Sequence, residues 1–115
     1  MVNSDNNTPA PVETFKVSIV IPAYNEQAVI EATINSLYAA LQGAPFDHEI
    51  RVVDDRSTDA TLRLLKQLSA QVPTLRTISN PSHGGYGMAV RAGLATFEGD
   101  AVIISMADGS DAPSD

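Results

Sequence analysis

The sequence contains no cysteine and no tryptophan, and it is poor in cations. The absence of cysteine excludes a disulfide framework and thiolate metal sites, and it fits a reducing compartment such as the cytoplasm. Seven Lys and Arg stand against 14 Asp and Glu, giving a net charge of −7. This balance argues against non-specific binding to nucleic acid or to anionic membranes. No stretch approaches the ~20 apolar residues of a membrane span.

A length of 115 residues with 43% hydrophobic content suits one compact domain. The opening MVNSDNNTPAPVE is polar and contains proline, which predicts a disordered polar leader over residues 1–15. The folded part is then expected over residues 16–115. An acidic domain of this kind needs a cation or focused local donors if its ligand is an anion.

From Lys16 onward, short apolar runs alternate with helical periodicity. Strands are expected at residues 17–21, 49–53, 75–79 and 101–106. Helices are expected between them, the first capped by Asn25 and the third presenting an apolar stripe of Tyr86, Val90, Leu94 and Phe97. This β-α-β-α-β-α-β pattern predicts a doubly wound α/β fold with a parallel sheet of order 3-2-1-4 and helices on both faces.

Polar clusters follow the carboxyl end of every expected strand. They are residues 22–26, residues 54–57, a Gly-rich loop with His83, and Asp108 with Asp111. In open parallel sheets this edge binds ligands at the switch point, here between the first and fourth strands. Converging carboxylates repel one another unless a cation lies among them, and oxygen ligands suit Mg²⁺ or Mn²⁺. A metal-bridged diphosphate would reconcile an acidic protein with an anionic substrate.

Several of these residues also have a purely structural interpretation. Ser57 and Asp59 could cap the second helix, and Asp108 with Asp111 could shape a turn. His83 could be an ordinary loop residue, and Tyr86 could belong to the core. Asp54 and Asp55 together exceed what one cap needs, which favours a functional role for this pair.

Two motifs in series, residues 17–26 (VSIVIPAYNE) and residues 52–59 (VVDDRSTD), resemble those of family 2 glycosyltransferases. The run over residues 80–94 is most similar to dolichyl-phosphate and polyprenyl-phosphate sugar synthases. The resemblance implies a GT-A fold, a nucleotide-diphospho-sugar donor such as a UDP- or GDP-sugar, and inverting transfer to an acceptor that can be a lipid phosphate. The implied donor-binding residues are Pro22, Tyr24, Glu26, Asp54, Asp55, Gly87 and Arg91, and the implied metal ligands are Asp108 and Asp111.

The sequence departs from the family pattern at two places. Arg56 occupies a position where the family often has glycine, and it could contact a phosphate or face solvent. The first acid of the usual Asp-x-Asp motif is Met106 here, which leaves the role of Asp111 open. The resemblance also implies an N-terminal part ending at the acidic loop, with the catalytic base beyond Asp115. We therefore expect residues 1–115 to bind donor weakly and to transfer little or no sugar, in the cytoplasm or at the cytoplasmic face of a membrane.

Other classes share some of these features. A phosphoacceptor receiver domain also carries an acidic pair, but after its first strand, and it needs a later lysine. A dinucleotide-binding domain would use Gly85-x-Gly87-x-x-Val90, although the third position is Val and the motif follows the third strand. A non-catalytic nucleotide-binding module is a further alternative.

Overall fold

The computed structural model describes residues 15–80, 86–95 and 97–107. The leader expected over residues 1–15 therefore lies outside the described residues, except for Phe15. His83, Asp108 and Asp111 also lie outside them.

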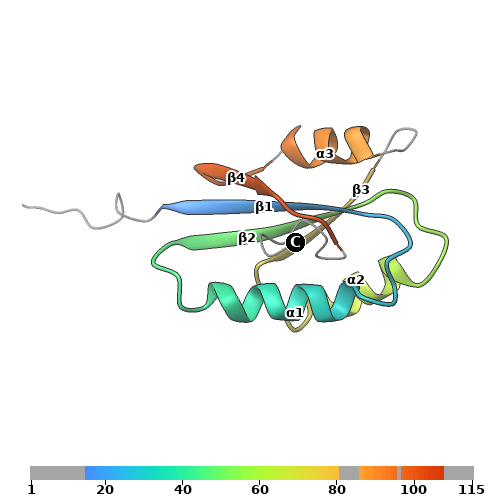
Figure 1. Ribbon diagram of the computed structural model, residues 1–115, viewed down its shortest axis with the longest axis horizontal. Helices are drawn as coiled ribbons and strands as arrows, with labels where there is room; N and C mark the ends of the chain where they lie inside the picture. The colour runs from blue at the N-terminus through green and yellow to red at the C-terminus, as the bar shows by residue number, and fades with distance from the viewer. Residues whose placement is uncertain (1–14, 81–85, 96, 108–115) are drawn as a thin grey trace, which may run out of the picture.

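Four strands and three helices alternate along the described chain. They are β1 (Lys16–Ala23), α1 (Ile30–Leu41), β2 (Asp47–Asp54), α2 (Thr61–Ser69), β3 (Leu75–Ser79), α3 (Tyr86–Ala95) and β4 (Ala101–Ile104). The strands form one sheet of order β3-β2-β1-β4, and every pairing is parallel. Helices α1 and α2 cover one face and α3 covers the other (Figure 1). The predicted fold class and strand order are confirmed.

Strand β1 lies at the centre of the fold, and seven of its eight residues are buried. Its side chains alternate between the two faces, as the pleat of a strand requires. Ile19 and Ile21 join the larger core beneath α1 and α2, whereas Val20 joins a smaller core beneath α3. A strand buried on both faces is necessarily apolar throughout, which explains the β-branched run at residues 17–21.

The apolar stripe predicted for α3 is only partly correct. Leu94 and Phe97 are each 36% exposed, and Phe97 lies beyond the last helical residue. The small residues Ala89 and Ala92 pack against the sheet instead. Their short side chains, three positions apart, lie on one face of the helix and allow its backbone to approach the sheet closely.

Two expected boundaries also differ from the structure. β4 ends at Ile104 rather than residue 106, and α1 begins at Ile30 after Val29, which makes no side-chain cap bond. The prediction that Asn25 caps α1 is therefore wrong. Its side chain is engaged by another loop, as described below.

A buried polar network joins the amino ends of β1, β2 and β4. The Glu49 side chain is fully buried and accepts from Arg51 Nη2 at 3.2 Å, from the Ser18 hydroxyl and from the Glu98 N–H at 2.8 Å. Ser18 Oγ in turn accepts from the Gly99 N–H at 2.8 Å. Burial by itself raises the pKa of Glu49, but the donors from Ser18, Glu98 and Arg51 outweigh it, and the pKa is lowered. Two charged residues inside an otherwise apolar strand are the only signal for this network in the sequence.

Candidate functional site

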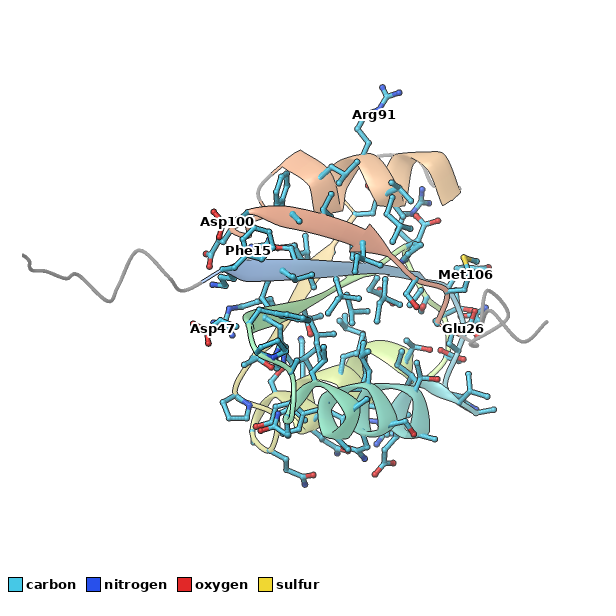
Figure 2. The ribbon with its side chains drawn as sticks, turned by 60° about the vertical axis from the view of Figure 1, so that its left-hand side comes forward. Phe15, Glu26, Asp47, Arg91, Asp100 and Met106 are labelled. Atoms are coloured by element: carbon cyan, nitrogen blue, oxygen red, sulfur yellow. The ribbon has the colours of Figure 1, made fainter. Side chains whose placement is uncertain are left out.

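The carboxyl ends of the parallel strands share one edge of the sheet. Figure 2 shows Glu26 and Met106 at this edge, and Phe15, Asp47 and Asp100 at the opposite one. The segments that follow β1, β2, β3 and β4 therefore meet where the sequence placed the candidate site.

The acidic pair after β2 is buried. Asp54 is 3% exposed and Asp55 9% exposed. Asp54 Oδ2 accepts from the Ser57 N–H at 3.3 Å, while its Oδ1 is buried without a hydrogen-bond partner in the described part of the chain. A buried acceptor without a hydrogen-bond partner costs about 1–3 kcal/mol of stability, so such a group points to a functional role.

Asn80 is a site residue that the sequence reasoning missed. It follows β3 directly and is 4% exposed. Its amide nitrogen donates to Asp55 Oδ1 at 2.9 Å, and its backbone N–H donates to the Asp54 carbonyl at 2.9 Å. The Asp55 N–H is itself held by the Ala23 carbonyl at 2.8 Å. Asp55 is thus held from the strands on both sides of β2, its backbone by Ala23 and its carboxylate by Asn80. Its position directly after a strand was the signal that could have identified Asn80.

The end of β1 and the loop after it carry three more predicted residues. Pro22 is buried in the strand and pairs in register with Val53. Tyr24 is 55% exposed. Glu26 is partly buried, and its carbonyl accepts from Ile30 N at 2.9 Å at the start of α1. These positions lie beside Asp54 and Asp55, because β1 and β2 are paired neighbours.

Ser57 and Asp59, in the loop after β2, were both candidates to cap α2. Asp59 Oδ1 accepts from the Thr61 N–H at 2.9 Å at the start of α2, but the N-cap residue of α2 is Ala60, which makes no side-chain cap bond. Desolvation raises the pKa of Asp59, but bonds from the Thr61 hydroxyl and N–H and from the Gln27 N–H outweigh it and lower the pKa. Ser57 does not cap the helix, because its hydroxyl accepts from the Asn25 N–H at 2.9 Å.

The other residues that the sequence associates with the donor site are Gly87, Arg91 and Arg56. Gly87 is in the first turn of α3. Arg91 is exposed, and its side chain points away from the sheet in Figure 2. Arg56 is exposed and has a left-handed φ of 62°. The structure therefore gathers Pro22, Tyr24, Glu26, Asp54 and Asp55, but does not bring Arg91 to them.

No group of three potential metal ligands occurs within the described residues. The predicted ligands Asp108 and Asp111 lie outside them. The described chain ends at Ala107, which is 1% exposed and whose carbonyl accepts from the Thr33 hydroxyl at 2.7 Å. This bond fixes the residue before Asp108 against α1.

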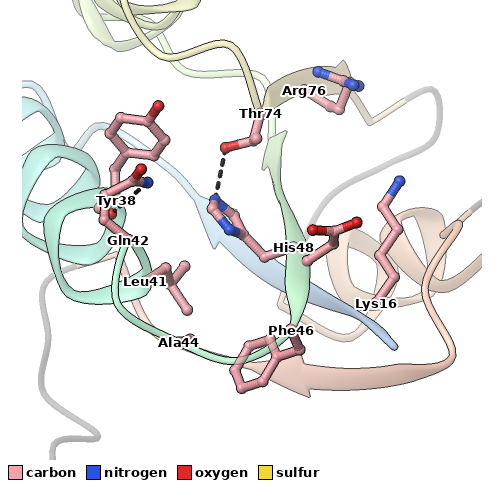
Figure 3. Close-up of a pocket in the computed structure, with 10 residues that line it drawn as sticks. Lys16, Tyr38, Leu41, Gln42, Ala44, Phe46, His48, Thr74 and Arg76 are labelled. Carbon is pink, nitrogen blue, oxygen red and sulfur yellow. Dashed lines mark hydrogen bonds between the residues drawn. The ribbon is translucent and has the colours of Figure 1, made fainter. Parts of the chain in front are cut away.

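A hollow of about 440 Å³ lies at the opposite, amino edge of the sheet (Figure 3). Its two cations already have partners: Lys16 Nζ pairs with Glu98 at 3.2 Å, and Arg76 Nη1 donates to the Pro73 carbonyl at 2.9 Å. Asp47 adds a negative charge to the same wall. The hollow therefore lacks the concentration of one charge that would recognise an ionic ligand.

His48 lies in this hollow. Its Nε2 is 2.7 Å from Thr74 Oγ1, and its ring meets the Tyr38 ring edge-on with centroids 5.9 Å apart. Burial lowers the pKa of His48, with Asp47 opposing the shift and Lys16 adding to it. These contacts describe a histidine of β2 that is packed against Tyr38 of α1.

The fold and the edge cluster define a class of protein. A parallel sheet with a switch point between β1 and β4, and acidic residues delivered beside it, is a doubly wound nucleotide-binding domain. Comparison with known families refines this class. The chain belongs to glycosyl transferase family 2, whose model matches residues 18–115. This membership gives no support to the receiver and dinucleotide-binding alternatives.

Curated relatives include lipid-phosphate sugar transferases. The chain is 36% identical over 94 residues to the dolichol-phosphate mannosyltransferase of Pyrococcus furiosus, covering 82% of this chain and 26% of that protein. It is 36% identical over 107 residues to an undecaprenyl-phosphate 4-deoxy-4-formamido-L-arabinose transferase of Pseudomonas fluorescens, covering 91% and 31%. The chain thus spans less than a third of the length of these relatives.

Solved structures show the same fold. The mannosyltransferase PcManGT from Pyrobaculum calidifontis, in complex with GDP-Man and Mn²⁺, matches with a TM-score of 0.73 and 30% identity, covering 88% of this chain and 30% of that one. TarS of S. aureus, in complex with UDP-GlcNAc, matches with a TM-score of 0.70 and 32% identity, covering 81% and 26%. The GT-A fold implied by the sequence motifs is confirmed. Among the described helices, none is long and apolar enough to cross a membrane.

Proposed function

We propose that this chain forms the donor-binding part of an inverting glycosyltransferase that moves a sugar from a nucleoside diphosphate to an acceptor. The observation that carries the proposal is the buried pair Asp54 and Asp55, oriented by Asn80 at the edge of the sheet beside the switch point. Family membership supplies the reaction class. Among the described residues, the buried Asp54 Oδ1 has no hydrogen-bond partner, which is consistent with a functional role for this pair.

The donor is a nucleotide-diphospho-sugar. In the proposal Pro22, Tyr24 and Glu26 line the nucleoside pocket, and Asp55, whose carboxylate accepts a hydrogen bond from Asn80, contacts the base or ribose. The exposed Tyr24 ring has apolar surface to offer a nucleoside. Gly87 and Arg91 are proposed on family resemblance alone. GDP-Man and UDP-GlcNAc in the two solved relatives support a GDP- or UDP-sugar.

A divalent ion, Mg²⁺ or Mn²⁺, is proposed at Asp108 and Asp111. Support comes from the Mn²⁺ in the PcManGT complex and from the fixed position of Ala107 just before Asp108. Bound there, the ion would neutralise charge on the leaving diphosphate. In the proposal, Asp55 fixes the nucleoside of the donor, so that the diphosphate of the donor is held near residues 108–111.

The acceptor is proposed to be a polyprenyl or dolichyl phosphate, because two curated relatives are named for such lipids. The reaction would then take place at the cytoplasmic face of a membrane. Residues 1–115 alone should bind the donor nucleotide but transfer sugar slowly or not at all, and rapid transfer by this chain would contradict that expectation.

The test is calorimetric titration and thermal shift with UDP, GDP and their sugars, with and without Mn²⁺, alongside NAD and acetyl phosphate. We expect metal-dependent stabilisation by one nucleotide, approaching about 2.7 kcal/mol when the ligand is at a hundred times its Kd. Asp55→Asn should weaken binding at least tenfold. Asp47→Asn, which removes the same charge at the other end of β2, should leave it unchanged. Stabilisation by NAD or acetyl phosphate alone, or equal effects of the two substitutions, would overturn the proposal.

A further inference from the structure

The loops after β1 and β2 are joined to each other by several hydrogen bonds. We call residues 24–29 the first donor loop and residues 55–60 the second donor loop. The Glu26 N–H donates to Thr61 Oγ1 at 2.8 Å, just beyond the second loop. The Gln27 N–H donates to Asp59 Oδ2 at 3.3 Å, and Gln27 Oε1 accepts from the Ala60 N–H at 2.8 Å. The two loops thus satisfy each other's backbone groups.

Asn25 is the centre of this network of hydrogen bonds between the two loops, which we call the lattice. Its backbone N–H donates to Ser57 Oγ at 2.9 Å. Its side-chain Oδ1 accepts from the Thr58 N–H at 2.8 Å and from the Asp59 N–H at 3.2 Å. One asparagine therefore engages three consecutive residues of the second donor loop, 32 to 34 positions further along the chain.

The backbone of Asn25 is also unusual. Its φ is 51°, in the left-handed region that residues other than glycine rarely adopt. Asparagine tolerates this region better than most residues, yet the conformation still costs free energy that the surroundings must offset. The bonds to Ser57, Thr58 and Asp59 supply that compensation, so the strained turn and the lattice depend on each other.

The lattice lies between the two groups of residues that are proposed to bind the nucleotide-sugar donor. Tyr24 and Glu26 flank Asn25 in the first loop, while Asp54 and Asp55 lead into the second. Asp54 Oδ2 also accepts from the Ser57 N–H, so Ser57 links Asn25 to the acidic pair. A change in the spacing of the loops would therefore change the distance between the two sides of the nucleoside pocket.

We propose that Asn25 is a positioning residue that locks the two donor loops into one rigid unit and thereby sets the width of the nucleoside pocket. The inference rests on the proposed function, which supplies its ligand, a nucleoside diphosphate. The coupling of the two loops rests only on the hydrogen bonds between them. Asn25 does not itself need to touch the nucleotide.

Three substitutions separate the contributions of Asn25. Asn25→Gly keeps the left-handed backbone accessible but removes the side-chain acceptor. Asn25→Asp keeps an acceptor oxygen and tolerates the same φ. Asn35→Ala, on the exposed face of α1, is the control for the loss of an asparagine outside the lattice. We expect Asn25→Gly to raise the Kd for the nucleotide (UDP or GDP, with Mn²⁺) about tenfold, Asn25→Asp to stay within about threefold, and Asn35→Ala to leave it unchanged.

Binding is measured where all variants are fully folded by circular dichroism, because a merely structural residue would then leave Kd unaltered. Hydrogen exchange supplies a second readout that needs no ligand. Asn25→Gly should speed exchange of the Thr58 and Asp59 amides at least tenfold and leave the Val52 amide in β2 protected. Unchanged exchange at Thr58 and Asp59 would overturn the coupling. Faster exchange with unchanged Kd would overturn the positioning role. If the unmodified chain binds neither nucleotide, the proposed function fails, and the exchange result still decides the coupling.

Discussion

Gly99 offers a direct test of how tightly β4 is seated against β1. A Cβ added at this residue would lie 2.6 Å from Ser18 Oγ, 2.7 Å from Ser18 N and 2.9 Å from Lys16 O. Two of these atoms belong to the backbone of the central strand, which cannot move without disturbing its neighbours. Overpacking of this kind costs about 1–3 kcal/mol. Loss of the Gly99 N–H bond to Ser18 adds about 0.5–1.5 kcal/mol.

Gly99→Ala should therefore lower the free energy of unfolding by about 2–4 kcal/mol, a large share of the 5–15 kcal/mol typical of a domain. Gly43→Ala is the matched control, since nothing lies within 4 Å of its added Cβ. It should be neutral or stabilise by up to about 1 kcal/mol, because alanine restricts the unfolded chain. Urea unfolding followed by far-UV circular dichroism suits a chain without tryptophan. Equal midpoints for the two variants would refute the packing argument.

Three further predictions use the same unfolding assay. Thr33→Val should lower the free energy of unfolding by about 0.5–1.5 kcal/mol, because it removes the hydrogen bond to the Ala107 carbonyl. Thr77→Val should be neutral or stabilising, because the Thr77 hydroxyl is buried without a partner among the described residues. A larger loss of stability for Thr77→Val than for Thr33→Val would contradict the hydrogen-bond assignments. The lowered pKa of Glu49 means that the unfolded chain takes up the proton first, so stability should fall as the pH drops below about 4.5, and Glu49→Gln should flatten that part of the profile. The pKa of His48 is also lowered, so stability should decline as the pH falls below about 6.5; a profile for His48→Gln identical to that of the unmodified chain would show that His48 does not contribute.

The strands and most of the helical pattern were predictable from local sequence, and the strand order followed from the usual topology of a doubly wound sheet. The β-branched run of β1 and the amphipathic pattern of α2, with Leu65 and Leu68 buried, are properties of neighbouring residues. Once the strands are parallel, the edge at which Asp54 and Asp55 lie follows from chain direction alone.

The predictions that failed depended on partners distant in sequence. Asn25 looked like a helix cap because such residues commonly are caps, yet its side chain is engaged more than 30 positions away. Asn80 carries no local signal for the Asp55 carboxylate that it contacts, and Glu49 carries none for the Ser18 hydroxyl. On α3 the larger apolar residues suggested the buried face, but close approach to the sheet favoured Ala89 and Ala92. Side-chain partners of this kind are set by tertiary contacts, which periodicity does not contain.

The order of the strands also has a consequence for how the protein is made. β1 leaves the ribosome first and occupies an inner position of the sheet, yet its second neighbour, β4, begins 85 residues after the start of β1. β1 and β2 can pair while synthesis continues, leaving the other edge of β1 open until Ala101–Ile104 has emerged. An open edge of an apolar strand is a template for pairing with other chains. During synthesis the nascent protein should therefore be most prone to aggregate in the interval between the completion of β2 and the arrival of β4.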